Sequence, residues 1–296
     1  MVERLSVRTW EGRRDRTIVC LHALGGSRAH WSGIGPRLAT IGTVHAVDLV
    51  GFGRTPLGAD GASLDVNRRL LADLLAETGP AVLVGSSFGG GVALMQAAAQ
   101  PVTVRALILS GSMLPAPTDH RNHAMADLTR RRLRQRGRDI RAAVGAVRDG
   151  RLRPNHASIH EYMLRGNAAD PAAMDQAVVA ASVEAARRPR VQAMRAGFSA
   201  ATSSFGLMTD PGRFDALLDT VEGPVLVIHG GLDRTVPVGN ARAVARARPD
   251  WDLVVLDGLG HMPHLEAPDA WLGLVTGWLT SAGAPAPRPA GPGRPR

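Results

Sequence analysis

Three residues of the sequence have the types that covalent acyl-transfer chemistry requires, namely Ser87, Asp233 and His261. A serine hydroxyl is a weak nucleophile that needs a base beside it, and a histidine base needs a carboxylate to orient its ring. The three occur in the chain order serine, acid, histidine, which is one of the orders in which such triads occur. Each residue alone is weak evidence, but together they predict a catalytic serine.

The local setting of the serine strengthens this prediction. Ser87 is the centre of a Gly-x-Ser-x-Gly motif that spans Gly85 to Gly89. The apolar run 81–84 before it predicts a buried strand, and the composition of 92–99 after it predicts a helix. A strand that turns at once into a helix strains its central residue, and flanking glycines avoid collisions with the neighbouring backbone. Strand, motif and helix together predict a nucleophile elbow.

The acid and the histidine each lie in a loop after a predicted strand. Asp233 follows the apolar run 223–228, and His261 follows the run 252–256. Parallel strands point their carboxyl ends to the same edge of a sheet. We therefore expect both side chains to converge on Ser87 although they are far from it in the sequence.

The remaining pattern predicts the fold that must position these residues. Short apolar runs alternate with helical patterns, which is typical of a three-layer α/β fold with a mostly parallel central sheet. Further strands are predicted at 4–10, 16–22, 43–48 and 104–109, and further helices around Trp31 and at 63–78, 238–247 and 268–279.

One segment departs from the alternating rhythm. From Pro115 to about Val221 we find amphipathic helical segments, with 172–187 and 191–201 as examples, and no convincing strand. We therefore predict an inserted all-helical cap domain over the edge that carries the site. The predicted organisation is an α/β core formed by 1–113 and 222–281, a helical cap at 114–221, and a disordered Pro/Arg-rich tail at 282–296.

Composition excludes several classes of protein. The net charge is +9, all 35 basic residues are arginine, and eleven of them lie in 119–153 against four aspartates. No aromatic residues are interleaved with those arginines and no nucleic-acid motif occurs, so we expect a solvated helix face and no nucleic-acid partner. No apolar run has the length of a membrane span, so we expect no membrane partner. A carboxylated substrate attracted by Arg130, Arg131 and Arg132 is a further hypothesis.

Other features set expectations about location and cofactors. Cys20 is the only cysteine and lies in an apolar run, which favours a buried packing residue. Without disulfides or an apolar leader at the N-terminus, we expect a cytoplasmic protein. No metal-ligand spacing and no dinucleotide fingerprint occurs, so we expect no cofactor and no metal. The expected partner is a small-molecule substrate, and a homodimer is left open.

With these motifs the chain resembles the α/β-hydrolase family, in its form with a helical cap, over about residues 4–280. The resemblance implies that Ser87 is the nucleophile, His261 the general base and then acid, and Asp233 the residue that holds the imidazole. It also implies an oxyanion hole formed by the backbone N–H groups of Leu24 and Phe88. The family usually has His-Gly at this loop, where Ala23 takes the place of glycine; a positive φ there would strain alanine.

The resemblance leaves the reaction open. Relatives with an Asp nucleophile, such as haloalkane dehalogenases and epoxide hydrolases, are disfavoured by Ser87. Carbon–carbon hydrolases of meta-cleavage products typically have Asn before the nucleophile and Trp after the histidine, where this chain has Ser86 and Met262. We therefore expect hydrolysis of an ester or lactone, with carbon–carbon hydrolysis second and cofactor-free perhydrolysis third. A non-catalytic ligand-binding protein of the same fold is the alternative from another class.

The expected substrate is small to medium in size and apolar. We predict that Leu24, Phe88, Met113 and Met262 form the floor of its pocket beneath the cap.

Overall fold

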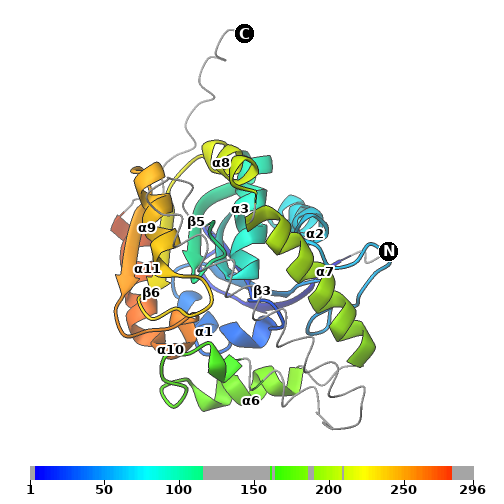
Figure 1. Ribbon diagram of the computed structural model, residues 1–296. Helices are drawn as coiled ribbons and strands as arrows, with labels where there is room; N and C mark the ends of the chain where they lie inside the picture. Colours follow the sequence, from blue (N-terminus) through cyan, green and yellow to red (C-terminus); the bar gives the residue numbers. More distant parts are fainter. Residues whose placement is uncertain (1–3, 116–160, 162–163, 186–189, 209, 282–296) are drawn as a thin grey trace, which may run out of the picture.

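The computed structural model describes residues 4–115, 161, 164–185, 190–208 and 210–281. In these residues seven strands form one sheet in the order β1-β3-β2-β4-β5-β6-β7 (Figure 1). The antiparallel pairing of β1 with β3 is followed by parallel pairings across the rest of the sheet. The strands are β1 (Ser6–Trp10), β2 (Thr17–Leu21), β3 (Thr43–Asp48), β4 (Ala81–Ser86), β5 (Val104–Ser110), β6 (Val225–Gly230) and β7 (Asp252–Leu256).

Helices cover both faces of the sheet. They include η1 (Arg28–Trp31), α1 (Gly35–Leu38), α2 (Leu64–Thr78), α3 (Phe88–Ala99), η2 (Pro101–Thr103), α9 (Val238–Ala247), α10 (Pro263–Glu266) and α11 (Pro268–Ser281). Side chains from α2, α3 and α9 belong to one apolar core, and side chains from η1, α1 and α11 belong to a second core. The predicted three-layer α/β architecture with a mostly parallel sheet is confirmed.

Alternation along the strands divides their side chains between the two cores. In β2, Val19 and Leu21 belong to the first core, while Ile18 and Cys20 belong to the second. Successive side chains of a strand point to opposite faces, so a sheet covered on both sides needs apolar residues at every position. Cys20 is fully buried, and this burial raises the pKa of its thiol. It is therefore a packing residue.

The described part of the chain between β5 and β6 includes the helices α6 (Gln176–Ala185), α7 (Arg190–Met208) and α8 (Pro211–Asp219). Helix α7 continues seven residues beyond the end predicted from the sequence, to the point where Asp210 caps α8 by accepting from the Arg213 N–H. Segment 116–160, which holds the arginine-rich stretch, and the tail 282–296 lie outside the described residues. The exact boundaries of the cap domain therefore stay predictions.

Helix α3 starts earlier than the sequence predicted. The composition favoured a start at Val92, whereas the helix begins at Phe88 and includes three consecutive glycines. A Cβ on Gly89 would lie 2.6 Å from the carbonyl carbon of Leu21, a backbone atom, so the close packing of the helix on the end of β2 requires glycine there. Tertiary packing thus overrides the low helix propensity of glycine. No helix of the described part of the chain combines the length and apolar character needed to cross a bilayer.

Candidate active site

The turn between β4 and α3 holds Ser87 in an unusual backbone conformation. Its φ of 49° and ψ of −112° make it the one non-glycine residue with positive φ in the described part of the chain. A Cβ on Gly85 would lie 2.6 Å from the carbonyl oxygen of Gly89, and a Cβ on Gly89 would lie 2.6 Å from the carbonyl carbon of Leu21. Strand and helix approach so closely that only glycine fits on either side of the serine. This is the geometry of a nucleophile elbow.

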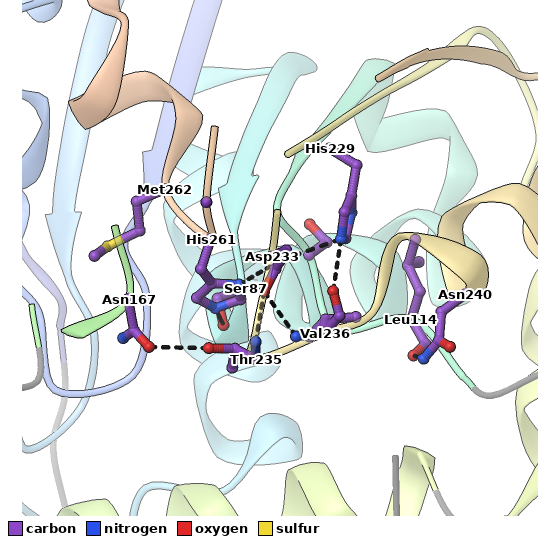
Figure 2. Close-up of polar contacts among 12 residues, drawn as sticks. Ser87, Leu114, Asn167, His229, Asp233, Thr235, Val236, Asn240, His261 and Met262 are labelled. Atoms are coloured by element: carbon purple, nitrogen blue, oxygen red, sulfur yellow. Dashed lines mark hydrogen bonds and ion pairs between the residues drawn. The ribbon is translucent and has the colours of Figure 1, made fainter. Parts of the chain in front are cut away.

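The three predicted catalytic side chains are brought together at the carboxyl edge of the sheet (Figure 2). The hydroxyl oxygen of Ser87 lies 2.9 Å from Nε2 of His261, and Nδ1 of His261 lies 2.7 Å from Oδ2 of Asp233. The histidine and aspartate are buried. Since Asp233 accepts the proton on Nδ1, the lone pair on Nε2 faces the serine hydroxyl, which is the arrangement that general-base activation needs.

Asp233 is held by four donors. Its Oδ1 accepts from the N–H groups of Thr235 at 2.7 Å and Val236 at 2.9 Å, while its Oδ2 lies near both His261 and His229. Burial opposes ionisation, but attraction by His261 and hydrogen bonds from both histidines outweigh it, so the pKa of Asp233 lies well below its ordinary value. The carboxylate is therefore ionised at neutral pH, as an orienting group must be.

His229 is a further member of this network, which the motifs in the sequence do not indicate. It is fully buried near the end of β6, with Nε2 2.9 Å from the carbonyl oxygen of Val236 and 3.2 Å from Oδ2 of Asp233. Both neighbours are acceptors, so the ring proton lies on Nε2. The available signal was a histidine in an otherwise apolar strand, four residues before the acid.

The loop after β2 holds the predicted oxyanion donor Leu24. Nδ1 of His22 donates to the carbonyl oxygen of Ala23 over 2.7 Å, and its Nε2 accepts from the N–H of Leu49 over 2.9 Å. Burial lowers the pKa of His22, which keeps this ring neutral. The positive φ of the loop occurs at Gly25, at 78°, and Ala23 has none, so the alanine is not strained.

The second predicted donor, Phe88, is the first residue of α3 and directly follows Ser87. The early N–H groups of a helix have no partner in the preceding turn, so they are available to an anion. The assignment of Leu24 and Phe88 to an oxyanion hole stays a prediction.

The four predicted pocket residues occupy different surroundings. Phe88 and Met113 are buried, and Leu24 is partly buried against the same apolar core as these two. The N–H of Met113 lies 3.4 Å from the carbonyl oxygen of Ser87, which places its backbone beside the nucleophile. Met262 belongs instead to a separate apolar cluster that includes residues of the insertion, namely Leu164, Ala168, Met174, Val178 and Val179. Their contact with substrate stays a prediction.

A second histidine near the triad has a different environment. His264 is fully buried, stacks on Trp31 at 4.7 Å between ring centroids, and its ring nitrogens have no hydrogen-bond partner among the described residues. Burial, together with repulsion by His261, lowers the pKa of His264 to about 3. It is a neutral packing residue at physiological pH. In the described part of the chain, no three His, Cys, Asp or Glu side chains gather in a way that could hold a metal ion.

Comparison with known proteins agrees with this geometry. Residues 18–273 match the model of the alpha/beta hydrolase family. A pimeloyl-[acyl-carrier protein] methyl ester esterase of Neisseria meningitidis is 27% identical over 271 residues, covering 88% of this chain and 91% of the relative.

Solved structures of hydrolases share the fold of this chain. An esterase from Thermogutta terrifontis superposes with a TM-score of 0.70 at 22% identity, covering 94% of this chain and 93% of its own. A 2-hydroxy-6-oxo-6-phenylhexa-2,4-dienoate hydrolase from a Rhodococcus species gives 0.69 at 25% identity, covering 93% and 95%. The family match spans most of the chain and includes the elbow, the acid loop and the histidine loop. The chain therefore belongs to the α/β-hydrolase family and is a hydrolase.

Proposed function

We propose that the protein is a serine hydrolase that cleaves a carboxylic ester or lactone through an acyl-enzyme on Ser87. The observation that carries the proposal is the continuous chain of hydrogen bonds from Ser87 through His261 to Asp233, with the serine at the strained tip of the elbow. That the Neisseria relative is named a methyl ester esterase supports the same class of reaction.

In the proposed mechanism, the Ser87 hydroxyl oxygen attacks the substrate carbonyl carbon while its proton passes to Nε2 of His261. The tetrahedral intermediate collapses, the bond to the alkoxy oxygen breaks, and His261 returns the proton to the leaving alcohol. Water then attacks the acyl carbonyl carbon while His261 takes its proton. The bond from this carbon to the Ser87 oxygen breaks, His261 returns the proton to Ser87, and the carboxylic acid leaves. Asp233 orients the ring and stabilises the imidazolium in both steps.

The negative charge of each tetrahedral intermediate develops on the former carbonyl oxygen of the substrate. We assign its stabilisation to the N–H groups of Leu24 and Phe88. Preorganised donors of this kind act where charge develops only in the transition state, and losing one typically costs roughly 3–4 kcal/mol. The buried, neutral His22 supports this role because it fixes the loop that contains Leu24 through its bond to Ala23.

The proposed substrate is small to medium in size and apolar in its acyl part. The test is hydrolysis of p-nitrophenyl esters of increasing acyl length, with a series of methyl esters beside them, by wild type and by Ser87→Ala. We expect turnover with an optimum of chain length that is abolished by Ser87→Ala. If the protein shows no turnover and a serine-reactive phosphonate does not label Ser87, a ligand-binding protein is favoured instead.

Carbon–carbon hydrolysis is the second candidate. The likeness to the dienoate hydrolase favours it, whereas Ser86 and Met262 occupy positions where such enzymes typically have Asn and Trp. A vinylogous diketone assayed beside the esters separates the two reactions. Preference for the diketone by a factor above ten in kcat/KM would reverse our ranking.

We further propose that the enzyme acts in the cytoplasm on a small-molecule substrate, without a nucleic-acid or membrane partner. The single, buried cysteine supports this location because it forms no disulfide within the chain. Fractionation of the producing cells tests the location, and size-exclusion chromatography with light scattering tests whether the protein is a homodimer.

A further inference from the structure

The backbone around His261 is held by groups outside its own loop. Glu266 in α10 is buried, and its carboxylate accepts from the N–H of Gly260 at 2.8 Å and from the N–H of Met262 at 3.1 Å. The N–H of His261 itself donates to the carbonyl oxygen of Asn167 at 2.8 Å. Three consecutive amides, with the catalytic histidine in the middle, are therefore fixed by two residues.

The same two residues join this loop to the helical insertion. Glu266 also accepts from the N–H of Ala169 at 2.7 Å, so one carboxylate links the insertion to both sides of His261. A Cβ on Gly260 would lie 2.6 Å from both the carbonyl oxygen of Asn167 and the nitrogen of Ala169. The insertion segment 167–169, which we call the docking segment, is thus packed directly on the histidine loop.

The docking segment also reaches the acid loop. The side-chain oxygen of Asn167 accepts from the hydroxyl of Thr235 at 2.9 Å, and the N–H of Thr235 donates to Asp233 at 2.7 Å (Figure 2). Asn167 therefore contacts the histidine loop through its backbone and the acid loop through its side chain. It is a bridge between the two loops.

We propose that Glu266 and Asn167 are positioning residues, through which the docking segment of the insertion holds His261 and Asp233 in register with Ser87. This inference rests on the proposed function, because it assigns a role in the proposed serine chemistry. The hydrogen bonds of Glu266 and Asn167 described above reach the histidine loop and the acid loop, so we assign their effect to the position of these two loops. In this proposal, the packing of the docking segment on the core fixes the position of His261 relative to Ser87.

The physical reason is the sensitivity of proton transfer to distance. Nε2 of His261 lies 2.9 Å from the serine oxygen, and a displacement of about 1 Å can lower the rate about 100-fold. A positioning residue that touches no substrate alters the rate of the chemical steps and leaves binding unchanged. Its removal lowers kcat with little change in KM.

The experiment compares Glu266→Gln and Thr235→Val with wild type, using a p-nitrophenyl ester and a fluorophosphonate that counts active sites. Glu266→Gln replaces one acceptor oxygen by a donor, and Thr235→Val removes the hydroxyl at constant volume. We expect both variants to label stoichiometrically. Per labelled site, kcat falls about 10- to 100-fold in Glu266→Gln and about 5-fold in Thr235→Val, with KM within about twofold of wild type.

Two variants serve as matched controls. Glu222→Gln neutralises an exposed carboxylate and leaves kcat unchanged. Thr235→Ser keeps the hydroxyl and restores most of the kcat lost in Thr235→Val. If Glu266→Gln fails to fold, the Thr235 pair decides the question alone, because Thr235 is only half-buried in a loop and we expect Thr235→Val to fold.

An unchanged kcat per labelled site in Glu266→Gln and Thr235→Val would overturn the inference, even if both variants melt at a lower temperature, since that pattern indicates a purely structural role. Ser87→Ala, measured in parallel, separates the two claims. Full turnover by Ser87→Ala would overturn the proposed function and this inference together, whereas loss of turnover in Ser87→Ala with unaffected positioning variants would overturn the inference alone.

Discussion

The elbow and the two loops opposite it place their catalytic groups by different means. Ser87 is fixed by backbone geometry, with a positive φ and glycines that let β4 and α3 approach closely. Asp233 is fixed by hydrogen bonds that it accepts from His229 and Thr235, and His261 is fixed because the amides on either side of it donate to Glu266. Perturbing the elbow should therefore damage folding, whereas perturbing the loops should damage the chemistry of a folded protein.

Asp233→Asn gives the largest expected effect on activity. The amide no longer stabilises the imidazolium, and its NH2 group favours the wrong tautomer of His261, so kcat/KM should fall about 10⁴-fold. Steady-state kinetics on a p-nitrophenyl ester measures the loss, and circular dichroism checks the fold. A loss below about tenfold would mean that the acid does not orient the base.

Gly89→Ala perturbs the elbow and should destabilise the fold. Its Cβ would collide with the backbone carbonyl of Leu21, which cannot move away cheaply, so the free energy of unfolding should fall by about 3 kcal/mol. Gly273→Ala is the matched control, because Gly273 lies in α11 with open space around its Cβ. This control should stabilise the protein by up to about 1 kcal/mol. Equal stability of the two variants in urea would refute the close-approach argument.

His229→Gln alters the hydrogen bonds that hold Asp233 in the acid loop. Removal of the ring N–H that faces Asp233 loosens the carboxylate, so kcat should fall about tenfold while stoichiometric labelling by a phosphonate persists. The measurement is kcat per labelled site. An unchanged kcat per labelled site would indicate that His229 is only a packing residue.

The smallest effect concerns the pH dependence of stability. The pKa of Asp233 is lower in the folded protein than its ordinary value of about 4, so its ionisation stabilises the fold above that pH, and this contribution is lost as the pH falls through the folded pKa. Because His229 contributes to the lowered pKa, His229→Gln should be less stable than wild type from pH 5 to 7, by about 1 kcal/mol. The gap should shrink below about pH 4; a gap that stays constant in urea titrations would point to packing instead.

The parts of the molecule that were predictable from sequence have local signals. Strands buried on both faces have continuous apolar runs such as 81–84, and the motif around Ser87 is contiguous, so the sheet and the elbow could be identified directly. The early start of α3 could not, because it depends on the close approach of Gly89 to the backbone of Leu21, and glycine propensity argues against it.

The network around the loops was only partly predictable. Asp233 and His261 follow strands and have a recognisable order, and His229 has only the weak signal of a histidine in an apolar strand. Asn167 and Thr235 meet only after the insertion has docked on the core. Contacts between segments 68 residues apart, such as Asn167 and Thr235, leave no periodic signal in a single sequence.

The most direct test of the account is to trap the covalent intermediate. Wild-type protein mixed with a p-nitrophenyl ester and quenched in acid within the first turnover should carry the mass of the acyl group on the peptide that contains Ser87. His261→Ala should carry none on that timescale, because the serine then lacks its base. Turnover by wild type with no acyl group on Ser87, or an adduct on another residue that Ser87→Ala leaves intact, would contradict the central claim.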